Sequence, residues 1–98
     1  MSYRTHVDAD LRLCLLRVLH ETPGCRTNAS ILQDAVNAIG HSASRAQVMA
    51  HLSYLESLSA VTLEAVGPVT VATLTDSGAD HLARRGAALP GVKLPALG

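Results

Sequence analysis

Two cysteines and a histidine near the end of the first helical pattern are the side chains whose chemistry best suits a metal ion. Cys14, His20 and Cys25 offer sulfur and imidazole ligands that Zn²⁺ accepts. Their spacing matches neither CxxC nor HxxxH, and Cys14 falls on an apolar stripe, where a free cysteine acts as a small apolar residue. We therefore expect no metal and no cofactor, and two reduced thiols rather than a disulfide.

Catalysis has less support still. Serine, histidine and aspartate are all present, but they are not accompanied by a nucleophile elbow, a Gly-rich phosphate-binding loop or paired carboxylates placed in a cleft. Asp8 and Asp10 are interpreted as charges that favour the positive end of a helix. We expect that the protein is not an enzyme.

A third group of side chains has the types needed to contact DNA. Arg45 can pair with guanine and Gln47 with adenine, and Met49 and Ala50 can touch thymine methyl groups. Alternatively, Gln47 only closes a capping box with Ser44, Arg45 is solvated, and the small apolar residues form a protein contact. The predicted DNA-binding residues are Arg26, Thr27, Asn28, Ser44, Arg45, Gln47, Met49, Ala50 and Ser53.

The elements that must position these side chains follow from hydrophobic periodicity. Apolar residues recur at helical spacing in the first half of the chain and then alternate on either side of Gly67-Pro68. The pattern predicts helices over 8–21, 28–39, 45–58 and 76–85, and strands over 61–66 and 69–74. The fold class is therefore mainly α with a β-hairpin. Its order, α-α-α-β-β-α, resembles that of a winged helix-turn-helix. We expect one domain over 1–86 and an extended tail over 87–98.

Two local patterns carry a resemblance to known families. One is Val48-x-x-x-Leu52-x-x-Leu55-Glu56-x-x-Ser59-Ala60-Val61, and the other is Val71-Ala72-Thr73-Leu74-Thr75-Asp76-x-Gly78-x-x-x-Leu82. They resemble the recognition helix entering the wing, and the wing entering its following helix, in bacterial regulators of the ArsR and MarR families. The sequence departs from them at Ser59, where these families usually have glycine. The whole pattern, closing with Pro90-Gly91-Val92-Lys93, also resembles small winged-helix proteins of Mu-like phages and prophages.

The charge distribution argues against strong DNA binding. Eight basic and eight acidic residues give a net charge of zero, whereas DNA-binding proteins usually show a basic excess or stripe. From Val61 to Thr75 there is no lysine or arginine, although a wing normally lies beside phosphates, where cations supply most of the affinity. We predict weak or dimer-dependent DNA binding.

The first helical pattern is apolar nearly all round. Leu13 and Leu16 add a second apolar surface, which either pairs two subunits or is covered by the tail. We predict a homodimer with Leu13 and Leu16 in its interface. The longest apolar run, residues 13–16, is far too short to cross a bilayer, and the N-terminus does not resemble a signal peptide. We expect a cytoplasmic protein without membrane contact.

These observations support three hypotheses. The first is a small dimeric transcriptional regulator that binds double-stranded DNA. The second is a winged-helix protein-protein interaction module, encoded by a phage or prophage and acting on a host or regulatory protein, since a fold alone does not fix function. The third is a metal-responsive switch, which requires Cys14 and Cys25 to reach one ion.

Overall fold

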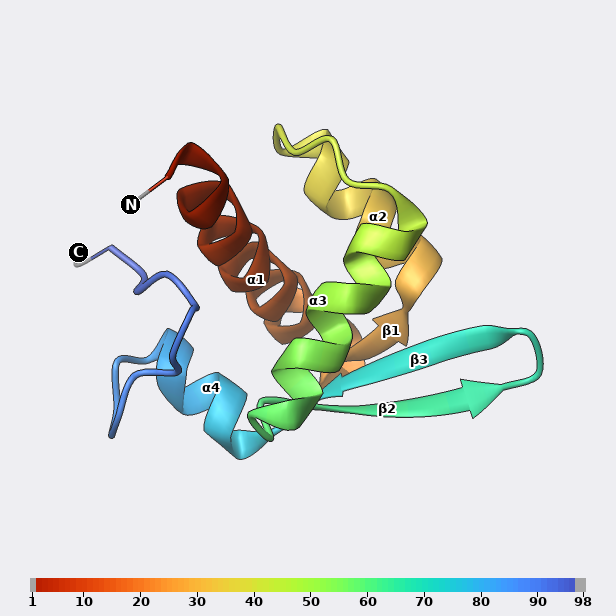
Figure 1. The fold of residues 1–98 in the computed structure, drawn as a ribbon. Coiled ribbons are helices and arrows are strands. Elements are labelled where there is room, and N and C mark those ends of the chain that lie inside the picture. Colours follow the sequence, from red (N-terminus) through yellow and green to blue (C-terminus); the bar gives the residue numbers. More distant parts are fainter. Residues whose placement is uncertain (1, 97–98) are drawn as a thin grey trace.

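Each helical pattern of the sequence forms a helix in the structure, a computed structural model that describes residues 2–96. The elements are α1 (Tyr3–Glu21), the 3₁₀ turn η1 (Pro23–Cys25), β1 (Arg26–Asn28), α2 (Ala29–Ala38), α3 (Arg45–Ser57), β2 (Val61–Val66), β3 (Val69–Leu74) and α4 (Asp76–Leu82). In Figure 1 the three longer helices pack together and the β2–β3 hairpin projects beside them as a wing. The predicted winged helix-turn-helix arrangement is confirmed. Met1, Leu97 and Gly98 of the predicted ranges lie outside the described residues.

Side-chain caps set where the four α-helices of residues 2–96 begin. Asn28 accepts a hydrogen bond from the backbone N–H of Ile31, and Thr75 accepts one from that of Gly78. The first helix begins five residues earlier than predicted, at Tyr3, because Ser2 caps it. Asp8 and Asp10 therefore lie inside α1, and the interpretation that they mark its start is wrong.

The sheet has one strand more than the sequence predicts. Its order is β1-β3-β2, and both pairings are antiparallel. The hairpin register places Val61 opposite Leu74 and Val66 opposite Val69. The additional strand, β1, pairs Thr27 with Ala72. Three residues are too few to show an alternating pattern, which is why the sequence does not reveal β1.

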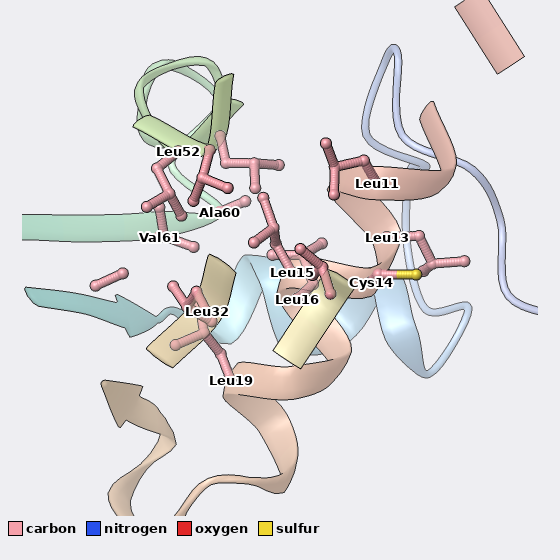
Figure 2. Close-up of a cluster of buried hydrophobic side chains, with 14 of the residues drawn as sticks. Leu11, Leu13, Cys14, Leu15, Leu16, Leu19, Leu32, Leu52, Ala60 and Val61 are labelled. Carbon is pink, nitrogen blue, oxygen red and sulfur yellow. The ribbon is translucent and has the colours of Figure 1, made fainter. Parts of the chain in front are cut away.

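The core surrounds α1, which is buried on several sides. Figure 2 shows leucines of α1 beside Leu32 of α2, Leu52 of α3 and the start of β2. The buried residues of α1 are Leu11, Leu13, Cys14, Leu15, Leu16 and Leu19. Leu13 and Leu16 are 1% and 0% exposed. Their side chains are therefore unavailable to a second subunit, and the predicted dimer interface at these two residues is wrong.

The C-terminal segment helps to cover this apolar surface. Residues 89–95, which we call the strap, form no helix or strand but pack against the domain. The backbone N–H of Lys93 donates to the carbonyl of Ala9 in α1, and Val92 is buried. The buried His81 of α4 accepts a hydrogen bond from Leu89 N–H, and its Nε2 lies 2.9 Å from the Lys93 carbonyl. The predicted tail thus forms no helix or strand, and it packs against the domain, as the alternative of a tail covering the first helix requires.

Candidate interface formed by α3 and the wing

The third helix turns one face to the core and the other to solvent. Val48, Leu52 and Leu55 are each 0% exposed, as their helical spacing predicts. On the opposite side, Ala50 and Ser53 are exposed. Helix α3 therefore presents a narrow surface of small side chains, with Arg45 and Gln47 at its N-terminal end.

Two of the predicted DNA-binding residues hold the start of α3. The Ser44 hydroxyl accepts from Gln47 N–H at 3.1 Å, and the Gln47 side-chain oxygen accepts from Ser44 N–H at 2.8 Å. This is the capping box that the sequence predicts. The capping box uses the side-chain oxygen of Gln47 and not its amide nitrogen. The cap fixes the orientation of the Gln47 side chain, and bidentate pairing with adenine, which needs both groups, would have to occur in that orientation or break the cap.

Arg45 lies at the edge of a hollow between α3 and the wing. Its Nε donates to the side-chain oxygen of Gln33 in α2 at 2.8 Å, which links the two helices of the helix-turn-helix. The half-buried Met49 lies one turn further along α3 and packs against the core. The hollow measures about 200 Å³, and its lining residues are Ala29, Ser30, Arg45, Met49, Pro68, Val69 and Thr70.

The predicted residues of β1 have structural partners of their own. Arg26 lies 3.6 Å from Glu64 of β2, and both side chains are more than half exposed. Thr27 pairs with Ala72 in the sheet, and Asn28 caps α2. The structure thus brings Arg45 and Met49 together at the hollow, whereas Arg26 lies beside an acid on the sheet.

The wing adds apolar surface rather than positive charge. Val66 and Val69, on either side of its tip, are 47% and 40% exposed, and Ile31 of α2 is 51% exposed. Glu64 is an acid on β2, and the hairpin contributes no lysine or arginine. The β2–β3 hairpin therefore offers no lysine or arginine side chain to a DNA phosphate.

A polar cluster that the sequence does not reveal fixes the back of α3 to α1. Arg12 Nε donates to His51 Nδ1 at 3.1 Å, and His51 Nε2 lies 3.5 Å from an oxygen of Asp8. The Arg12 guanidinium also stacks over the Tyr54 ring at 4.2 Å, while the Tyr54 hydroxyl donates to the Pro90 carbonyl. Burial, reinforced by the nearby Arg12 charge, lowers the pKa of His51. A neutral His51 with its proton on Nε2 satisfies both neighbours.

Comparison with known proteins finds two similar sequences, one of them from a phage. Over 86 residues, 88% of each chain, the sequence is 40% identical to the uncharacterized protein gp26 of Escherichia phage Mu. The chain belongs to the family of this phage Mu protein. It is also 42% identical over 64 residues to an uncharacterized protein of Haemophilus influenzae, a match that spans 65% of this chain and 62% of that protein. No family model matches the chain.

The predicted resemblance to proteins of Mu-like phages is thus confirmed, whereas membership of the ArsR or MarR families stays a prediction. Within residues 2–96, none of the helices has the length and apolar character required to cross a bilayer.

Proposed function

We propose that this protein is a small transcriptional regulator that binds double-stranded DNA through α3. The observation that carries the proposal is how α3 is held. Its inner face is buried in the core, the capping box fixes its first turn, and His51 ties its middle to α1. The opposite face, including Ala50 and Ser53, is exposed along the helix. A rigid second helix of a helix-turn-helix with an uncovered face suits the major groove.

Electrostatics limit how tightly this surface would hold DNA. Glu64 lies beside Arg26, so Arg45 is the principal phosphate partner among the predicted residues. Each neutralised phosphate contributes about −0.9 to the slope of log K against log salt concentration. We therefore expect the association constant to fall about 3.5-fold between 50 and 200 mM salt for one bound copy, and about 12-fold for two copies bound as a dimer.

A homodimer on two half-sites remains part of this proposal, because it doubles the number of phosphate contacts. Its interface would have to lie outside Leu13 and Leu16, which are buried within one chain.

The second candidate function is a winged-helix protein-protein interaction module. Val66 and Val69 on the wing, together with the hollow that contains Met49, favour it. Apolar surface at the centre of a patch with few charges is typical of protein interfaces. Such a partner would bind with little salt dependence, because few ions are displaced.

A fluorescence anisotropy titration with a mixed-sequence DNA duplex at 50 and 200 mM salt tests the proposal. Arg45→Ala is the test variant, and Arg85→Ala, which removes the same charge from an exposed position beyond α4, is the matched control. We expect Arg45→Ala to weaken binding and flatten the salt dependence while Arg85→Ala does neither. Absence of binding at 50 mM salt, or equal loss in both variants, would reject DNA binding through α3 and favour the protein-interaction module.

A further inference from the structure

Three side chains with metal-binding chemistry meet where α1 faces the turn between α2 and α3. Asp10 and Cys14 are four residues apart on α1, so they lie one turn apart on the same face of the helix. His41 comes from the turn that follows α2. One carboxylate oxygen, one sulfur and one imidazole nitrogen from these residues all lie within 4.8 Å of one another.

A single oxygen of Asp10 is the centre of this cluster. Asp10 Oδ2 lies 2.8 Å from His41 Nε2 and 3.6 Å from Cys14 Sγ. The other oxygen, Oδ1, lies 3.2 Å from the ammonium group of Lys93 in the strap. The carboxylate therefore directs one oxygen toward the two other ligands and uses the second to bind an outer partner, as metal-ligating carboxylates commonly do.

We propose that Asp10, Cys14 and His41 bind one Zn²⁺ ion, with the fourth coordination position open to water. Ligand atoms about 2.0–2.3 Å from a tetrahedral zinc ion lie roughly 3.3–3.8 Å apart. The sulfur–oxygen separation already falls in this range, and the nitrogen–oxygen pair has to separate by about half an ångström. The His41 turn can supply that movement, because it follows Gly40, which lies outside the helix.

The site combines a buried sulfur with access from solvent. Cys14 is 8% exposed and the His41 side chain is 12% exposed. A surface hollow lined by Tyr3, Val7, Ile39 and Gly40 also borders Asp10 and His41, and it offers an entry path for the ion and its water.

The proton balance of binding is simple. In the metal-free protein the Cys14 thiol donates to Asp10 Oδ2, and so does His41 if Nε2 carries its proton. Binding of Zn²⁺ releases the thiol proton to solvent and leaves the imidazole neutral, with its proton on Nδ1. No oxidant or other reactant is needed.

Metal binding would restrain the helix-turn-helix. His41 lies in the same turn as Ser44, the residue that caps α3. A bond from His41 through the ion to α1 would therefore fix the start of α3, whether α3 contacts DNA or a protein. The zinc proposal is independent of the proposed function, and its test involves no DNA.

The test is a zinc titration of the full chain without an affinity tag, in competition with a chromophoric chelator. The variants are Cys14→Ser and His41→Gln. The matched controls are Cys25→Ser and His20→Gln, which change the same residue types outside the cluster. Replacing Zn²⁺ with Co²⁺ adds a second readout, since a thiolate ligand gives the cobalt protein an intense charge-transfer absorption.

We expect one Zn²⁺ per chain, with affinity lowered more than about tenfold in both cluster variants, because even outer partners of metal ligands affect affinity by about 10- to 100-fold. The controls should bind like the wild type, and Cys14→Ser should lose the cobalt absorption. If Cys14→Ser does not fold, His41→Gln decides alone. Absence of zinc binding by the wild type, or equal affinity in His41→Gln and His20→Gln, would overturn the proposal.

Discussion

Replacing Leu16 with alanine distinguishes a core residue from a dimer-interface residue. Leu16 is 0% exposed within one chain and lies in the cluster of Figure 2. Buried leucine-to-alanine changes lower the free energy of unfolding by about 2.7–5.0 kcal/mol, the range measured in T4 lysozyme. We expect about 3 kcal/mol for Leu16→Ala, a large part of the roughly 5–15 kcal/mol typical of a small domain. The melting temperature should fall by about 12–24 °C.

Urea denaturation of wild type, Leu16→Ala and Ile31→Ala, each at two protein concentrations tenfold apart, measures this loss. Ile31 is 51% exposed, so its truncation should change the free energy of unfolding by less than about 1 kcal/mol. If Leu16 is a core residue, the free energy of unfolding lost in Leu16→Ala is independent of protein concentration. If Leu16 lies in a subunit interface, that loss depends on protein concentration. The burial argument would be refuted by a loss below about 1 kcal/mol accompanied by dissociation of a dimer in sedimentation.

Three further predictions concern α3, α4 and the wing. The pKa of His51 in the folded state lies below its ordinary value of 6.5. As the pH falls below 6.5, the unfolded chain therefore binds more protons than the folded chain does. The free energy of unfolding should therefore decline from pH 6.5 to 5, and His51→Gln should flatten this decline in urea titrations. Gly78→Ala places a methyl group against the carbonyl of Ala60, which accepts a hydrogen bond from Thr75 N–H. We expect urea denaturation to show that the free energy of unfolding falls by about 1–2 kcal/mol, although alanine has the better helix propensity. Glu64→Gln removes the acid beside Arg26 and should make the salt slope of DNA binding steeper by up to about 0.9, and an unchanged slope would place the wing away from phosphates.

Local patterns in the sequence were enough to predict most of the fold. The strands over 61–66 and 69–74 match residue by residue, and the third helix differs by one residue at its end. These elements depend on periodicity and on caps such as Ser44 and Thr75, which act within three residues. The sequence predicts an extended tail over 87–98 but not where it packs, because its contacts, such as Lys93 with Ala9, join opposite ends of the chain.

The candidate sites were predicted less well, because side-chain partners are set by tertiary packing. The sequence groups Cys14 with His20 and Cys25 as candidate metal ligands, whereas the candidate ligands near Cys14 in space are Asp10 and His41. Asp10 and Cys14 show helical spacing, but nothing local indicates that the turn after α2 returns to them. The ion pair of Arg26 with Glu64 is equally hidden, since the two residues belong to different strands of the sheet.

The salt dependence of binding decides more about α3 than the affinity does. Its exposed face carries small side chains such as Ala50 and Ser53, which allow close approach by a DNA groove or by another protein. With zero net charge, the chain gains little long-range attraction to DNA, so DNA binding would depend on Arg45 and on short-range fit. A modest affinity is therefore compatible with either partner. If Arg45→Ala flattens the slope of log K against log salt concentration, the partner is DNA and Arg45 contacts its phosphates. If binding does not change with salt, α3 makes an apolar contact with a protein.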